Sequence, residues 1–319
     1  MRTNLVAVFF ILLAGCLQQD TPDNETNKHP DKQTIIPPEF QADSAYNYIQ
    51  KQVDFGPRVP NSQSHIACGN YLEEKLKSFG LEVSTQSGIA TAYDGTKLKF
   101  KNIIASYKPQ EKSRILLCAH WDTRPFADQD KINPNTPILG ANDGGSGVGV
   151  LLEIARLLQE GNLLTGIDII LFDAEDYGKS QVENSYCLGS QYWSKNKHVK
   201  NYQPKYGILL DMVGAKNATF TMEGYSMMYA PHIVKSVWKT AAKLGYSDYF
   251  IFKRTSPMID DHYYLNQLGG VPCIDIIQHD PSTLSGFGSA TKRTHSNGKR
   301  SAPDHKVDAS TIRYHRRDQ

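Results

Sequence analysis

The stretch that decides the fold, residues 116–149, reads LLCAHWDTRPFADQDKINPNTPILGANDGGSGVG. Its first part is an apolar run that stops at His120 and Asp122, which predicts a buried strand with two polar side chains at its end. Its last part, from Asn142 to Gly147, has the composition of a glycine-rich turn that opens a helix. Because ligands in α/β folds bind at the carboxyl ends of the strands, we expect a metal at this strand end.

Apolar runs of strand length alternate with amphipathic helical patterns along the rest of the chain. Strands are predicted at residues 81–86, 97–107, 114–119, 167–172, 206–210 and 271–277, and helices at 42–53, 65–79, 147–158 and 231–244. Strands that alternate with helices form sheets covered on both faces. We therefore expect a three-layer α/β/α sandwich with a mostly parallel mixed central sheet.

The composition is that of an ordinary globular protein, with 319 residues and a net charge of +2. One catalytic domain over residues 35–288 is the economical interpretation. Much of the basic excess lies near the C-terminus, so the main body offers no nucleic-acid-binding face and we expect no nucleic-acid partner. We expect a monomer.

Residues 1–16 have the features of an export signal: a basic start at Arg2, an apolar run and small residues before Cys16. The apolar run is too short to span a bilayer. The sequence LAGC resembles the bacterial lipobox, which implies a lipid anchor on Cys16 and a protein facing the periplasm or the cell exterior. An ordinary secretory signal with an incidental Cys16 is the alternative. Residues 17–34 are polar and predict a flexible tether.

Four cysteines follow the signal: Cys68, Cys118, Cys187 and Cys273. Export permits disulfides, and four cysteines allow three pairings, among which the sequence does not choose. Cys118 and Cys273 lie in apolar runs, which also fits buried free thiols. Both alternatives stay open.

Acidic and histidine residues recur where the predicted strands end. They are His120, Asp122, Asp143, Glu175, Asp176, Asp211 and Asp260. Several carboxylates at one sheet edge repel one another unless a cation or protons hold them, and carboxylates with imidazole suit zinc. Glu175 and Asp176 are adjacent and point in different directions, so one can bind a metal while the other carries a proton. Two solvated acids in a turn are the alternative for this pair taken alone.

Several short motifs carry a family resemblance. AHWD at residues 119–122, GANDGGSG at 140–147, FDAED at 172–176 and LGS at 188–190 resemble the successive motifs of zinc-dependent M28-type aminopeptidases. LDMVGA at 210–215 and IDDH at 259–262 resemble the glutaminyl cyclase branch of that clan. The resemblance runs in order over most of the predicted domain.

The resemblance implies that Asp143 and Asp176 bind zinc and that Glu175 is the acid/base. It implies that Asp211 and Asp260 are inner carboxylates that hold the substrate amine. In the aminopeptidase relatives, it implies that His120 binds a second zinc. It implies first a one-zinc glutaminyl-peptide cyclotransferase that acts on peptides with an N-terminal Gln. A two-zinc aminopeptidase is the alternative from the same fold. A non-catalytic, inactive peptide-binding lipoprotein is a third.

The C-terminal residues depart from the family pattern. The family places its last zinc ligand in a Trp-His-Thr motif, which this chain lacks, and Lys292 falls near the expected position. His295 is the nearest substitute. The basic tail at residues 289–319 contains no Leu, Phe, Met or Trp, which argues against a packed helix. We interpret the change in composition as a frame shift, with a natural divergent tail as the competing hypothesis.

Overall fold

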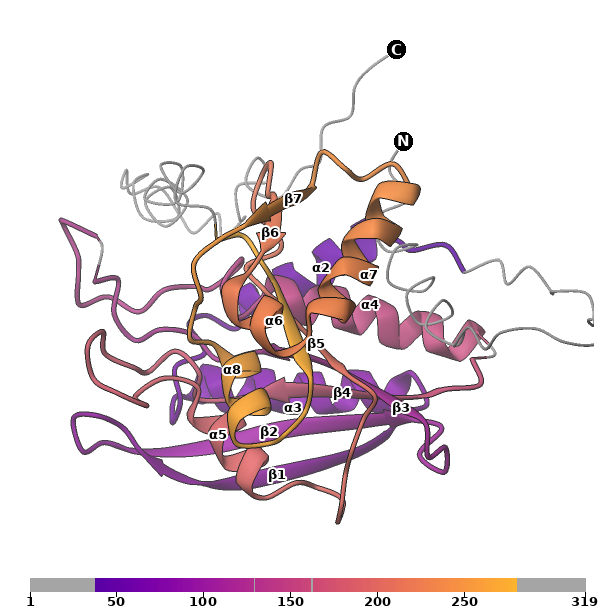
Figure 1. Ribbon diagram of the computed structural model, residues 1–319. Coiled ribbons are helices and arrows are strands. Elements are labelled where there is room, and N and C mark those ends of the chain that lie inside the picture. The colour runs from indigo at the N-terminus through magenta and orange to yellow at the C-terminus, as the bar shows by residue number, and fades with distance from the viewer. Residues whose placement is uncertain (1–37, 129, 162, 280–319) are drawn as a thin grey trace, which may run out of the picture.

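The computed structural model describes residues 38–128, 130–161 and 163–279 (Figure 1). The predicted signal peptide with Cys16, the tether, and the tail with His295 lie outside these ranges. None of the helices within them has the length and apolar character needed to cross a membrane.

A six-stranded sheet forms the centre of the fold. The strands within the described residues are β1 (Glu82–Thr91), β2 (Lys97–Tyr107), β3 (Arg114–His120), β4 (Gly166–Phe172), β5 (Gly207–Asp211), β6 (Phe220–Met222), β7 (Phe250–Arg254) and β8 (Cys273–Ile277). The central sheet has the order β1-β2-β4-β3-β5-β8. β4, β3, β5 and β8 pair in parallel, whereas β2 pairs antiparallel with both β1 and β4. The predicted mostly parallel mixed sheet is confirmed.

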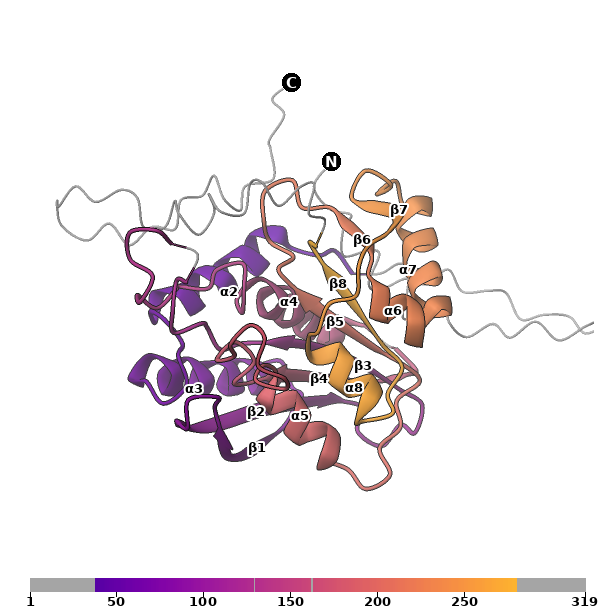
Figure 2. The same cartoon turned by 60° about the vertical axis from the view of Figure 1, so that its left-hand side comes forward.

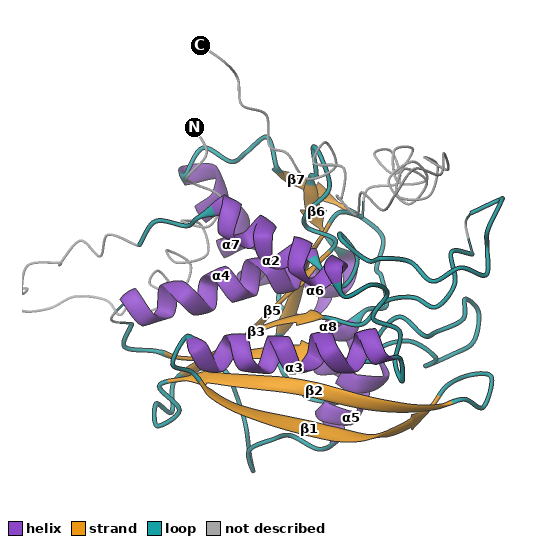
Figure 3. Cartoon of the chain, turned by 180° about the vertical axis from the view of Figure 1, so that it is seen from behind, coloured by secondary structure: helices purple, strands orange, loops and turns teal. Residues whose placement is uncertain are grey.

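Helices cover both faces of this sheet (Figures 2 and 3). They are α2 (Ala42–Asp54), α3 (Gln63–Ser78), α4 (Ser146–Glu160), α5 (Leu188–Lys195), α6 (Gly224–Tyr229), α7 (Pro231–Lys243) and α8 (Asp261–Gln267). α2, α3, α4 and α7 share one apolar core with one face of the sheet, and α5 and α8 share another with the opposite face. The three-layer sandwich predicted from the sequence is therefore confirmed.

The packing of β3 explains why the central strands have unbroken apolar sequences. Ile115 and Leu117 pack on the α4 side, and Leu116 and Cys118 pack on the α5 side. Every residue of β3 and of β4 is buried, as expected for parallel strands covered on both faces. The first polar side chains after these apolar runs lie at the carboxyl ends of the strands, and the site lies at that edge of the sheet.

Two glycines set how the segment after β3 returns to the sheet. Gly144 has a φ of +80°, and a Cβ there would lie 2.2 Å from the carbonyl oxygen of Asp122. A Cβ on Gly147 would lie 2.1 Å from the carbonyl oxygen of Leu210 in β5. Any larger residue would push α4 away from β5, so these glycines fix the position of the turn that carries Asp143.

Two predicted elements are longer in the structure than the sequence indicated. The predicted strand at 81–86 extends to Thr91 in β1, and the predicted helix at 147–158 spans Ser146–Glu160. The sequence did not predict the second, two-stranded sheet formed by β6 and β7. Cys68, Cys118, Cys187 and Cys273 are all free and buried, so the expectation of buried thiols holds for Cys118 and Cys273.

Candidate metal centre

The candidate site lies at the carboxyl ends of the parallel strands. His120 is the last residue of β3 and Asp211 is the last residue of β5. Glu175 and Asp176 follow the end of β4 within a few residues, and Asp260 caps the N-terminus of α8. His120, Glu175, Asp176 and Asp211 therefore lie at or just after the ends of central strands, as the sequence predicted, whereas Asp260 lies at the start of a helix.

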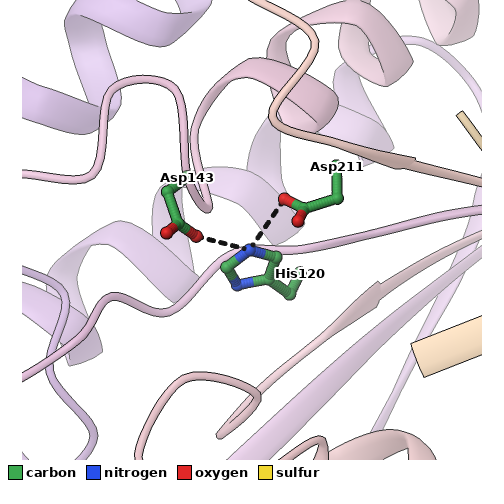
Figure 4. A group of neighbouring side chains, drawn as sticks. All are labelled: His120, Asp143 and Asp211. Carbon is green, nitrogen blue, oxygen red and sulfur yellow. Dashed lines mark hydrogen bonds and ion pairs between the residues drawn. The ribbon is translucent and has the colours of Figure 1, made fainter. Parts of the chain in front are cut away.

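His120 brings two of the predicted carboxylates together (Figure 4). Its Nε2 atom lies 3.1 Å from Asp143 Oδ1 and 3.2 Å from Asp211 Oδ1. One potential ligand atom from each of the three residues lies within 4.8 Å of the others. An imidazole and two carboxylates at this spacing are a donor set that suits a divalent transition metal.

The charges around His120 favour a cation at this point. Burial lowers the pKa of the imidazole, but hydrogen bonds to the carboxylates of Asp122, Asp143 and Asp211 outweigh burial and hold the pKa well above 6.5. Burial raises the pKa of Asp211 to about 7, although His120 opposes that change. Buried carboxylates this close together are held by protons or by a cation.

Asp176 provides the clearest test of whether a metal fits. Its Oδ2 atom is buried without a hydrogen-bond partner, while Oδ1 accepts a hydrogen bond of 3.3 Å from Arg124. Burial, followed by the negative charge of Asp143, raises the pKa of Asp176 well above 3.8. A buried carboxylate oxygen without a partner costs free energy, and a cation shared with Asp143 would remove that cost. The residues therefore fit a metal.

Asp122 holds the turn that carries Glu175 and Asp176. Its two carboxylate oxygens accept the backbone N–H groups of Glu175, at 2.9 Å, and of Asp176, at 3.1 Å. Asp122 is fully buried. The sequence placed Asp122 at a strand end but did not reveal this positioning role, because the two N–H groups belong to a segment more than fifty residues away.

Glu175 has the environment of a proton carrier. Burial raises the pKa of its carboxyl group well above 4.5; His120, 3.8 Å away, opposes this rise, and the charges of Asp176, Asp260 and Asp261 add to it. Its side chain is 13% exposed, so it still reaches the surface of the site. A carboxyl group with a raised pKa in a partly closed site is suited to general acid/base catalysis.

Sequence reasoning missed Cys187, which touches the predicted acid/base. Its thiol donates a hydrogen bond of 3.3 Å to Glu175 Oε1, and its backbone N–H donates to the carbonyl oxygen of Glu175 at 2.8 Å. Cys187, Glu175 and Asp260 form a second group whose potential ligand atoms lie within 4.8 Å of one another. No sequence signal pointed to Cys187, because a long loop separates it from Glu175.

The predicted residues thus fall into two neighbouring groups, one around His120 and one around Glu175. Asp143 and Asp211 belong to the first, and Asp260 belongs to the second. Asp211 contacts His120 directly, and His120 in turn lies 3.8 Å from Glu175. Asp176 interacts with Asp143 through its charge.

A comparison with protein families decides the family. The family model of peptidase family M28 matches residues 102–317, which is more than half of the chain. The chain belongs to peptidase family M28. The resemblance inferred from the AHWD, GANDGGSG and FDAED motifs is confirmed.

Solved structures of similar chains share the fold of this chain. A glutaminyl cyclase from Bacteroides thetaiotaomicron bound to N-acetylhistamine is 57% identical, with a TM-score of 0.76; the match covers 78% of this chain and 88% of that chain. A Zn-dependent exopeptidase from Parabacteroides distasonis is 52% identical, with a TM-score of 0.77, and the match covers 79% of this chain and 88% of that one.

A more distant relative is the glutaminyl-peptide cyclotransferase of Drosophila melanogaster. It is 26% identical over 171 residues, which are 51% of this chain and 46% of that protein. This M28 chain therefore aligns with less than half the length of that curated relative.

Proposed function

We propose that this chain is a glutaminyl-peptide cyclotransferase that converts the N-terminal Gln of a peptide to pyroglutamate and releases ammonia. The observation that carries the proposal is the 57% identity to a glutaminyl cyclase over 88% of that chain. The geometry supports it, because Glu175 combines a raised pKa with a position beside Asp260 at the edge of the sheet.

We further propose that one zinc ion is held by Asp143 and Asp176, with His295 as the third ligand. The unpartnered oxygen of Asp176 supports the first two positions, whereas His295 lies outside the described residues. Bound zinc would act as a Lewis acid on the side-chain amide carbonyl of the substrate.

The protein side chains then have separate tasks. Asp260 and Asp211 hold the α-amine of the substrate near Glu175. Glu175 takes a proton from that amine as its nitrogen bonds to the side-chain carbonyl carbon, and gives the proton to the amide nitrogen that leaves as ammonia. Both reacting groups belong to one residue, so the site mainly has to fold the substrate and exclude water.

A second candidate function is a two-zinc aminopeptidase. The group formed by His120, Asp143 and Asp211 favours it, because these three side chains could bind a second metal ion next to the first. Peptide hydrolysis requires an attacking water, which a pair of metal ions can supply. Cyclisation does not require that water.

The deciding experiment uses the purified full chain with zinc, a peptide beginning with Gln and a matched peptide beginning with Leu. Ammonia released from the Gln peptide at unchanged chain length supports the cyclase. Free amino acid released from either peptide, with two zinc ions bound, supports the aminopeptidase. An N-acetylated Gln peptide is the control, since its blocked amine cannot cyclise. Absence of both turnover and metal would favour the inactive peptide-binding alternative.

We also propose that the protein is exported and anchored to a bacterial membrane by a lipid on Cys16, as a monomer. The LAGC sequence at residues 13–16 supports the anchor. Replacement of Cys16 by Ala should move the protein from the membrane fraction to the soluble fraction of the cell. Equal membrane association of the variant and the wild type would contradict the anchor.

A further inference from the structure

Cys187 ends the loop before α5 and lies at the N-cap of that helix. Its φ of +59° places the backbone in the left-handed region, and its side chain is fully buried. The thiol faces the carboxylate of Glu175, with 3.3 Å between Sγ and Oε1. A buried thiol that touches a carboxylate pairs a soft donor with a hard donor.

Asp260 completes this group with an unused oxygen. Its Oδ1 accepts the backbone N–H of Asp261 at 2.5 Å, whereas Oδ2 is buried without a partner. The residue is 4% exposed. One Asp260 oxygen lies within 4.8 Å of both the thiol and the Glu175 carboxylate. An unpartnered buried carboxylate oxygen in such a group needs a proton, a water or a cation.

The separations fit a cation. Donors on a tetrahedral ion with metal–sulfur and metal–oxygen bonds of ordinary length lie about 3.6 Å apart, close to the distance between Cys187 Sγ and Glu175 Oε1. We propose that Cys187, Glu175 and Asp260 form a cation site that binds a thiophilic divalent ion such as Cd²⁺ or excess Zn²⁺. The thiol proton leaves to solvent as sulfur coordinates the ion.

This site differs in composition from the group around His120. That group offers one imidazole and two carboxylates, whereas the site around Cys187 contains sulfur, the ligand that selects soft ions. An ion bound there would occupy Glu175 and the place where Asp260 holds the substrate amine. The expected consequence, which rests on the proposed function, is inhibition that competes with the peptide.

The test titrates Cd²⁺ into the zinc-loaded full chain without substrate. Cadmium–thiolate charge-transfer absorbance reports binding to sulfur, and equilibrium dialysis gives the stoichiometry. The variants are Cys187→Ser, which keeps the shape of the side chain, and the control Cys68→Ala, which removes another buried thiol that belongs to no potential metal-binding group among the described residues.

We expect the wild type and Cys68→Ala to bind one Cd²⁺ with the absorbance band. Cys187→Ser should lose the band. Its Cd²⁺ affinity should also fall, and by a larger factor than the roughly 10–100-fold drop that follows loss of an outer-shell partner. Asp260→Asn keeps the thiol, so it should keep the band but need more Cd²⁺ to reach it. Circular dichroism checks that each variant is folded.

Two results would overturn the proposal: a wild type without the band, or a Cys187→Ser protein with the wild-type band and affinity. If Cys187→Ser fails to fold, Asp260→Asn decides, because an unchanged Cd²⁺ affinity in that variant contradicts the site. Since no arm requires turnover, a chain that fails to cyclise Gln peptides still gives a result on the cation site.

Discussion

Glu175 and Asp176 are adjacent in the sequence, yet their environments assign them different chemistry. Asp176 has an oxygen without a partner and faces the charge of Asp143, which suits a metal ligand. Glu175 contacts a thiol and lies near a histidine, which suits proton transfer. Since both depend on Asp122 for their backbone position, the two functions are coupled through one buried carboxylate.

Replacement of Glu175 by Gln should abolish turnover without releasing zinc. The amide has nearly the same shape but cannot take a proton from the substrate amine, and loss of a general acid/base typically costs about 10²–10⁴-fold in rate. Ammonia release and metal content are measured on the same sample. Glu183→Gln, an exposed change in the same loop, is the control. Undiminished turnover in Glu175→Gln would refute the role of Glu175.

Replacement of Asp122 by Ala should weaken both stability and zinc binding. It leaves the two backbone N–H groups of Glu175 and Asp176 buried without acceptors, and each such loss costs about 1–3 kcal/mol. Urea unfolding and zinc content check the two effects. Asp94→Ala is the control, because it removes an exposed carboxylate that accepts a backbone N–H in a turn. It should change the stability and the zinc content little. A zinc content equal to that of the wild type would show that Asp122 does not position Asp176.

The candidate site residues were predicted from two kinds of sequence pattern, the end of an apolar run and a glycine-rich turn. Asp143 was found through its glycine-rich turn, and Glu175 and Asp176 through the end of a wholly buried strand. Cys187 was not found, because its contact with Glu175 depends on the path of an irregular loop. No local pattern encodes that path.

At the scale of elements, the length and the regularity of the apolar pattern decided which strands could be predicted. β3 and β4 are buried along their whole length, so their sequences contain unbroken apolar runs. β6 has only three residues, and β7 is exposed over its last three. Such short, half-exposed strands carry too few residues for a period to be recognised, so the second sheet was missed.

α6 illustrates how a buried carboxylate fixes a short helix. Glu223 precedes α6 and accepts the backbone N–H groups of Tyr225, at 2.8 Å, and Ser226, at 2.7 Å. It also lies 3.0 Å from His262 Nε2 in α8. Burial raises the pKa of Glu223, but His262 and the backbone N–H groups outweigh burial and lower the pKa to about 2.

This pKa predicts a loss of stability in acid. The pKa of Glu223 is lower in the folded than in the unfolded chain, so its stabilisation is present above pH 4.5 and is lost as the pH falls towards about 2. The difference between the folded and unfolded pKa values of Glu223 corresponds to about 3 kcal/mol of stability. The free energy of unfolding in urea should therefore differ between the wild type and Glu223→Gln, and this difference should shrink by about half between pH 7 and pH 3. Exposed Glu82→Gln is the control, and a difference independent of pH would contradict the prediction.

At the scale of the whole molecule, the site is assembled from segments far apart in the chain because parallel strands end at one edge. β3, β4 and β5 contribute His120, the Glu175–Asp176 turn and Asp211. β8 pairs in parallel with β5, and Ile277 lies opposite Asp211. The chain therefore leaves β8 at the same edge, beside a candidate ligand. This topology is the reason to test a residue that follows β8 as a ligand.

That placement gives a test for the tail. If His295 supplies the third zinc ligand, His295→Ala should lower zinc affinity by more than about tenfold, as measured by competition with a chelator. His305→Ala, in the same tail, is the matched control and should bind zinc like the wild type. Equal affinities of the two variants would mean that His295 binds no zinc. The frame-shift hypothesis would then gain support, and resequencing the 3′ end of the gene would decide it. An intact reading frame would reject the frame shift and leave Asp143 and Asp176 as the two zinc ligands.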